Sequence, residues 1–169
     1  MFVCFIGATI LSFLSIFCFF GTGVSFDAHG IISDSYSMFE LMFGCDREIS
    51  ILGHRETMHV DASGGMPFLF VVQVFIMIAA VVVWVFVRKS SFGNKGLAIS
   101  TGVSGLLSVL GLILSFCTLP LSGVKGDGYQ ITKLGYGAIV YSVINIISVG
   151  LIGIGLYFWF NDTKYLRGI

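Results

Sequence analysis

Four long apolar segments alternate with polar segments along the chain. Each apolar segment could cross the hydrocarbon core of a bilayer, which is about 30 Å thick and takes about 20 helical residues. Because backbone in lipid must satisfy its own hydrogen bonds, runs this apolar are expected to be helical. No charged side chain occurs in residues 1–26, 62–87, 96–124 or 134–161. The pattern predicts transmembrane helices at about 2–22, 67–87, 97–119 and 135–160.

The polar and apolar positions of the first long connection predict further elements. In "DSYSMFELMFG" Ser37 and Glu40 have the spacing of a capping box, and Gly44 is a natural helix stop, so a short helix is expected between them. "REISILG" and "ETMHVDA" alternate polar and apolar residues, which predicts a β-hairpin. "GYQITKLG" in the second long connection is a third strand candidate. Since three strands are about the minimum for a stable sheet, we expect one small antiparallel sheet as a cap.

The composition agrees with a membrane protein. The chain is 56% hydrophobic and 11% charged, whereas soluble domains have about 45–50% and about 25%. We therefore expect an all-α integral membrane protein, a four-transmembrane-helix bundle that forms a single membrane domain over residues 1–169. The first apolar run has no basic residue ahead of it and is longer than the core of a usual signal peptide, so it is interpreted as a retained helix. The predicted inner loop is at about 88–96, and the predicted outer loops are at about 23–66 and 120–134.

The density of Lys and Arg predicts the orientation. "RKSSFGNKG", between the second and third helices, has three basic residues in nine, whereas the longer first connection has only Arg47 and Arg55. Basic connections stay in the cytoplasm, so both termini are predicted to be cytoplasmic and the β-containing cap extracellular, in the cell membrane. The formal net charge is zero, and nothing indicates nucleic-acid binding. The expected partners are the lipid bilayer and a membrane protein or further copies of this chain.

Polar and small residues inside the predicted helices are candidate contacts. Gln73 and Asn145 are amides at membrane depth, which suits either interhelical hydrogen bonding or the lining of a pore. The third helix carries small residues at steps of three and four, the pattern that lets helix backbones approach closely. The small residues are Gly96, Ser100, Ser104, Ser108, Gly111 and Ser115. The predicted helix-packing or partner interface comprises Ser100, Ser104, Ser108, Gly111, Gln73 and Asn145.

The segment "GHRETMHVD" is the strongest candidate for chemistry. His59 and Asp61 share one face of a strand and could hold zinc or copper with His29 or Cys45 as a further donor. His54 lies five residues from His59, which does not match the helical pair of zinc proteases, where the spacing is four. We therefore favour a solvated strand face and expect no metal, no cofactor and no catalytic residue.

The four cysteines, Cys4, Cys18, Cys45 and Cys117, form no C-x-x-C motif. A disulfide from Cys45 to Cys18 or Cys117 is left open.

The predicted layout resembles that of claudin-like tetraspans in outline, with four helices, both ends inside, a long first outer loop with strands and a short second one. That family carries a tryptophan and a G-L-W-x-x-C…C signature in its first loop. The first loop of this chain has no tryptophan and one cysteine, so the sequence is assigned to no family.

Three functions are compatible with these patterns. The favoured one is a non-enzymatic membrane protein that acts through protein–protein contacts, as an accessory subunit or tetraspan-like interaction protein, because recognisable site chemistry is missing. The second is an oligomeric channel or carrier for a small solute, lined by Gln73, Asn145 and the serines of the third helix. The third is a membrane-surface enzyme or metal site built on His54, Glu56, His59 and Asp61.

Overall fold

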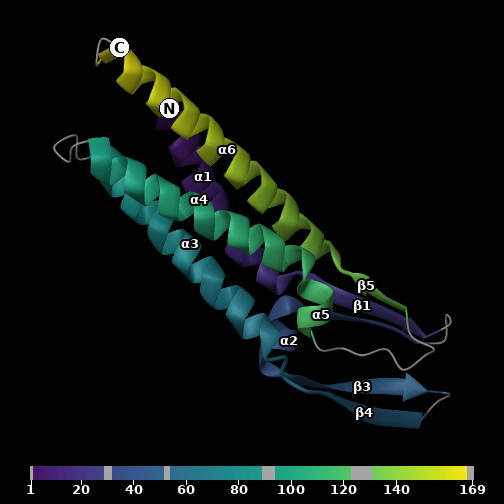
Figure 1. Ribbon diagram of the computed structural model, residues 1–169. Helices are drawn as coiled ribbons and strands as arrows, with labels where there is room; N and C mark the ends of the chain where they lie inside the picture. The colour runs from purple at the N-terminus through teal and green to yellow at the C-terminus, as the bar shows by residue number, and fades with distance from the viewer. Residues whose placement is uncertain (1, 29–31, 52–53, 89–93, 123–130, 167–169) are drawn as a thin grey trace. The chain divides into compact units, whose positions relative to one another are not determined.

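The computed structural model describes residues 2–28, 32–51, 54–88, 94–122 and 131–166 (Figure 1). The elements in chain order are α1 (Phe2–Leu14), the 3₁₀ helix η1 (Ser15–Phe20), β1 (Thr22–Ala28), β2 (Ile32–Ser37), α2 (Met38–Phe43), β3 (Cys45–Ile51), β4 (His54–Val60), α3 (Gly65–Arg88), α4 (Asn94–Phe116), α5 (Thr118–Ser122), β5 (Ile131–Leu134) and α6 (Tyr136–Leu166). They form two compact units. The helical unit comprises residues 1–16, 71–113 and 142–169, and the strand unit comprises residues 17–70 and 114–141.

Over the described ranges, four helical segments are long and apolar enough to cross a membrane. They are Val3–Phe20, Gly65–Phe86, Ile99–Phe116 and Tyr136–Asn161. The prediction of a mostly helical, multi-pass membrane protein is confirmed at this level.

Two of the long helices end a few residues before the apolar runs that predict them. The first helix was expected to reach residue 22, but its α-helical part ends at Leu14, and η1 leads directly into β1. The third was expected to reach residue 119, but α4 ends at Phe116. Pro120 explains this end, because proline has no N–H to donate to the Phe116 carbonyl. The Cys117 N–H instead donates to the Leu114 carbonyl over 3.0 Å, and the short helix α5 follows.

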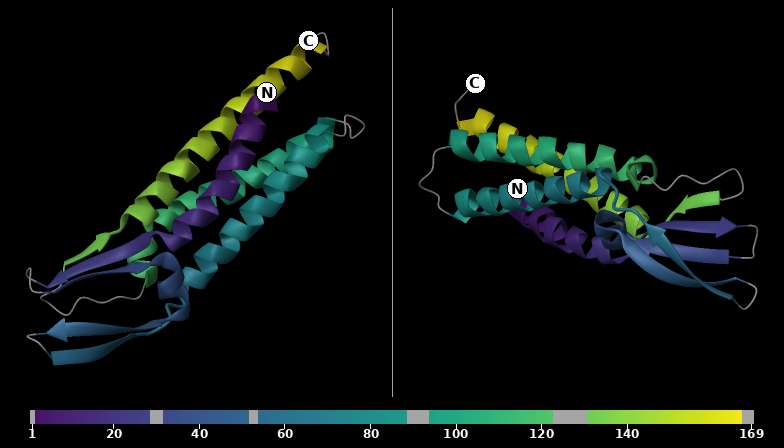
Figure 2. Two further views of the ribbon diagram at one scale, coloured as in Figure 1. Left: turned by 180° about the vertical axis from the view of Figure 1, so that it is seen from behind. Right: turned by 90° about the horizontal axis from the view of Figure 1, so that it is seen from below.

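Close approaches between helices hold the helical unit together. A Cβ added to Gly155 of α6 would lie 2.7 Å from the Phe5 ring of α1, and one added to Gly105 of α4 would lie 3.3 Å from Ile152 of α6. Small residues permit such approaches, and dispersion contacts between the helices then stabilise the bundle. Figure 2 shows α1 beside α6. Gln73 connects α3 to α1, because its amide N–H donates to the Ser12 carbonyl over 2.8 Å and to the Ser15 hydroxyl.

Among its described residues, the strand unit contains two antiparallel sheets. One has the order β2-β1-β5, and the other pairs β3 with β4. The predicted hairpin is confirmed, with Cys45 opposite Val60 and Ile51 opposite His54. The predicted third strand is confirmed as β5, but the prediction of a single three-stranded sheet is wrong. β5 pairs with β1, and β1 also pairs with β2, two strands that the sequence patterns did not indicate.

The β2-β1-β5 sheet contacts the start of α6 through glycine residues. A Cβ on Gly137 would lie 2.7 Å from the backbone carbon of Gly21, and the Gly135 N–H donates to the Gly23 carbonyl over 2.9 Å. The backbone around Gly21 therefore contacts the backbone around Gly137 directly, with no room for a side chain between them.

The short helix α2 has the predicted ends. Ser37 caps it, with the Glu40 N–H donating to the Ser37 hydroxyl over 3.1 Å and the Ser37 N–H donating to the Glu40 carboxylate over 2.8 Å. Gly44 follows its last residue with a φ of 78°, a conformation that favours glycine. The apolar side chains of α2 divide into a buried set, Met38, Leu41 and Met42, and an exposed pair, Phe39 and Phe43.

Candidate interaction surfaces

Most residues of the predicted packing or partner interface lie inside the helical unit. The side chains of Gln73, Asn145, Ser104 and Ser108 are at most 4% exposed. Gly111 is also buried, whereas Ser100 is partly exposed. Ser104 lines a cavity of about 10 Å³ together with residues that include Ser12 and Ile152. These burials are compatible with helix packing, and their role in binding a partner stays a prediction.

The β3–β4 hairpin presents a polar face. Cross-strand pairing places Asp46 opposite His59, Glu48 opposite Thr57 and Ser50 opposite Arg55. The His59 ring contacts the Asp46 carboxylate through Nδ1, and its Nε2 lies 3.4 Å from Asp61. Arg55 and Glu48 lie 3.9 Å apart and are 83% and 70% exposed, so this pair contributes about 0–1 kcal/mol at most. The face is therefore solvated and carries both signs of charge.

The donor sets considered for a metal do not assemble in the described part of the chain. There, no three His, Cys, Asp or Glu residues lie close enough together to hold a metal ion. His29 lies outside the described residues, as do the side chains of His54 and Glu56. Cys4, Cys18, Cys45 and Cys117 are all free thiols, so the disulfide left open from Cys45 does not form in this structure.

Arg47 links the base of the hairpin to the rest of the strand unit. Its guanidinium donates to Asp34 of β2 over 2.6 Å and to Glu40 of α2 over 3.0 Å, and lies 5.1 Å from the centre of the Tyr36 ring. Burial alone would raise the pKa of Glu40, but hydrogen bonds from Ser37 and Arg47 outweigh it and lower that pKa. Burial and the nearby Asp34 raise the pKa of Tyr36 to about 12. The hairpin is thus held at one end by charge-assisted hydrogen bonds.

Three phenylalanines form an exposed aromatic cluster that the sequence patterns did not reveal. Phe20 stacks on Phe39 with ring centroids 5.4 Å apart, and Phe39 contacts Phe43 at 4.8 Å. Phe20 and Phe43 are each 65% exposed. Phe20 is the last residue of the first segment that is long and apolar enough to cross a membrane, and aromatic rings are favoured where such segments meet water.

Comparison with known proteins adds no relative from which a role could be inferred. The chain matches no model of a known protein family, and no curated protein matches it in sequence. A functional proposal therefore depends on the residues of this chain alone.

We predict that His59 titrates above its ordinary pKa. The hydrogen bond to Asp46 raises the pKa of His59 above 6.5, and its electrostatic attraction adds to this. The stabilisation of the folded hairpin is then fully present below about pH 6.5 and is lost as the pH rises through the folded-state pKa. An NMR titration of the His59 ring should give the raised value, and Asp46→Asn should lower it. A His59 pKa that Asp46→Asn leaves unchanged would contradict the contact.

Proposed function

We propose that this chain is a non-enzymatic multi-pass membrane protein that binds a protein partner through the β3–β4 hairpin. The observation that carries the proposal is that the hairpin forms a two-stranded sheet of its own. An isolated two-stranded hairpin is only marginally stable in water. A polar hairpin that is attached at one end gains stability when a second protein covers it.

The free edges of the hairpin support this mode of binding. Within the described segments, β3 pairs only with β4, so each strand has one edge without a strand neighbour. Such an edge presents backbone N–H and C=O groups to solvent. An extended segment of a partner can add to it as a further strand, with the backbone hydrogen bonds contributing affinity and the side chains specificity.

The charges on the hairpin favour a protein partner in water over lipid. The exposed residues Asp46, Glu48 and Arg55 carry both signs. Mixed charges of this kind steer a complementary protein surface and set its register.

The two other candidate functions have less support. The cavity beside Ser104 is about 10 Å³, the volume of about one water molecule, and the Gln73 amide hydrogen-bonds to α1 rather than facing an open path. A channel would therefore have to form between copies of the chain. An enzyme at the membrane surface would need catalytic groups beyond the solvated His59 and its two acidic neighbours.

We also propose that the strand unit is extracellular and both termini are cytoplasmic. The pairing of β1 with β5 supports part of this, because it joins the two long connections and requires both to lie on the same side of a membrane. The density of Lys and Arg assigns the opposite side to the cytoplasm.

Topology reporters test this orientation. A reporter inserted at Gly64 should read external, whereas reporters at Ser91 and at the C-terminus should read cytoplasmic. Protease protection of sealed vesicles is an independent readout of the same three sites. A cytoplasmic signal at Gly64 would overturn the orientation.

The hairpin proposal is tested by Thr57→Lys. Thr57 is exposed and lies opposite Glu48, so a lysine there forms a favourable cross-strand pair and leaves the hairpin folded. The added cation should hinder addition of a further strand, as edge lysines do. We expect about a tenfold weaker association, equivalent to about 1.4 kcal/mol, with the protein that co-purifies with the wild-type chain from native membranes in mild detergent.

Ala62→Lys is the matched control, because Ala62 is exposed but lies outside both sheets. It should leave the association unchanged. Equal retention of the partner by the wild type and Thr57→Lys would remove the hairpin from the interface. Equal loss from both lysine variants would indicate a general effect of charge.

A further inference from the structure

The short helix α2 has one buried face and one exposed aromatic face. Phe39 and Phe43 are four residues apart, so they lie on the same face of the helix. Their side chains are 38% and 65% exposed, whereas Met38 and Leu41 are fully buried. Contact with water does not favour the aromatic face, because removing apolar surface from water is the main favourable term in folding and association. An apolar surrounding is therefore expected for this face.

Phe20 connects the aromatic face of α2 to the first apolar span. The Phe20 ring stacks on the Phe39 ring, and Phe39 contacts Phe43. Phe20 is also the last residue of Val3–Phe20, the first of the four spans. A helical segment that crosses the hydrocarbon core ends where the core meets the head groups. The three rings form one cluster within the strand unit, so the depth of Phe20 in a membrane also sets the depth of the other two rings.

The other three spans also carry exposed aromatic side chains at the end that belongs to the strand unit. The side chains, each within four residues of that end, are Phe68, Phe116 and Tyr136. They are 53%, 61% and 65% exposed. Aromatic rings are favoured at the boundary between lipid and water. The aromatic cluster thus lies at the end of a span whose counterparts have the same character.

The charge on α2 is compatible with a position at the lipid surface. Glu40 is the one charged residue of this helix, and its carboxylate forms an ion pair with Arg47 of β3 over 3.0 Å. A helix at the membrane surface places its apolar face among the acyl chains and keeps its charges at the level of the head groups. The pairing with Arg47 lowers the cost of bringing Glu40 close to lipid.

We infer that the aromatic cluster of Phe20, Phe39 and Phe43 is a membrane-binding surface, with its rings among the head groups and the upper acyl chains of the bilayer. Lipid is favoured over a protein as the partner, because the cluster continues an apolar span and carries no charge that would select a protein surface. The ion pair between Glu40 and Arg47 then attaches the base of the β3–β4 hairpin close to the membrane. The inference depends neither on a partner of the hairpin nor on the orientation of the chain.

Tryptophan fluorescence in lipid vesicles tests the position of the cluster. Trp84 and Trp159 are the two tryptophans of the chain, and both are replaced by phenylalanine before Phe43→Trp introduces a single fluorophore. The full-length variant is reconstituted into phosphatidylcholine vesicles whose acyl chains carry bromine either near the head group or near the chain end. We expect the bromine near the head group to quench the fluorescence about twofold more than the deeper bromine, because surface helices insert only a short way into the acyl region.

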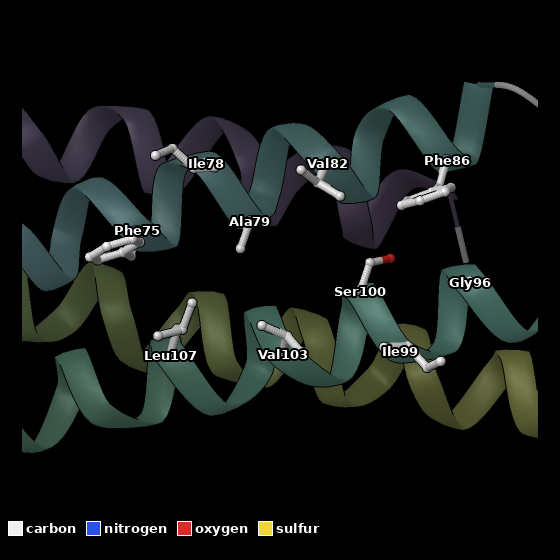
Figure 3. A pocket seen from close by; sticks show the side chains of 10 residues that line it. All are labelled: Phe75, Ile78, Ala79, Val82, Phe86, Gly96, Ile99, Ser100, Val103 and Leu107. Atoms are coloured by element: carbon white, nitrogen blue, oxygen red, sulfur yellow. The ribbon is translucent and has the colours of Figure 1, made fainter.

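Phe75→Trp is the control for a deep position. Phe75 is 54% exposed and lies in the middle of the span Gly65–Phe86. It contributes to the α3–α4 groove, an apolar groove of about 470 Å³ lined from Phe75 to Phe86 on α3 and from Gly96 to Leu107 on α4 (Figure 3). The deeper bromine should quench this variant more strongly. Thr57→Trp, at an exposed position of the hairpin, is the control for water, and iodide in the buffer should quench it.

Two outcomes would overturn the inference. Quenching of Phe43→Trp by iodide to the same extent as Thr57→Trp would mean that the cluster lies in water. Quenching by neither iodide nor bromine would mean that a protein covers it, whether a partner or a second copy of this chain. If the chain without native tryptophan fails to fold, NMR of the wild type in lipid nanodiscs gives the answer. A nitroxide on the upper acyl chain should broaden the ring signals of Phe39 and Phe43 more than a gadolinium chelate in water does, and the reverse order would overturn the inference.

Discussion

Gly135→Ala should lower the free energy of unfolding by about 3 kcal/mol, at the upper end of the usual range for overpacking. A Cβ at Gly135 would lie 2.6 Å from the carbonyl carbon of Thr22 and would overlap its oxygen. These are backbone atoms, so no side-chain rotation can make room. Moving the chain apart would break the hydrogen bond from the Gly135 N–H to the Gly23 carbonyl, 2.9 Å long. That shift would also disturb the pairing of β5 with β1.

Thermal unfolding in detergent measures this effect. A loss of about 3 kcal/mol corresponds to a Tm lower by about 6–12 °C for a chain of this size. Gly150→Ala is the control, because a Cβ at Gly150 would meet nothing within 4 Å, and alanine is favoured over glycine in a helix by about 1 kcal/mol. It should leave the Tm unchanged or raise it. An unchanged Tm for Gly135→Ala would show that the junction of β5 and β1 is looser than described.

Ser104→Leu should destabilise the helical unit by about 1–3 kcal/mol. Ser104 is 4% exposed, and the cavity beside it has a volume of only about 10 Å³. The extra carbon atoms of leucine exceed that space, so α4 would have to move away from the neighbouring residues that line the cavity, which include Thr101 and Ile152. Small residues are required where helix backbones lie this close.

The measurements for Ser104→Leu are the Tm in detergent and the fraction of protein that elutes as a single species. Ser104→Ala keeps the side chain small and should be tolerated. Gly150→Leu adds a bulky side chain at an open position of α6 and should also be tolerated. If Ser104→Leu has the wild-type Tm, the small-residue face of α4 is not a packing face.

Local patterns of the sequence determined those elements whose causes lie within a few residues. The membrane-spanning segments follow from long uncharged apolar runs, because partition into hydrocarbon depends on each segment's own composition. The ends of α2 follow from the capping pair Ser37 and Glu40 and from Gly44. The β3–β4 hairpin follows from alternating polar and apolar residues around a short turn. The small and polar residues inside the helices, and the solvated polar face of the hairpin, were also apparent from the sequence.

Only the tertiary structure decided which distant segments meet. β1 begins where the first apolar run ends, and it is a strand because it pairs with β2 and with β5, more than 100 residues away. Local propensity does not predict such a partner, because strand pairing depends on neighbours across the sheet. The glycine contact between Gly21 and Gly137 brings β5 to β1, and this pairing leaves β3 and β4 as a sheet of their own. The hydrogen-bond partners of Gln73 and the α3–α4 groove likewise arise only when helices pack, because each is formed by residues from two helices.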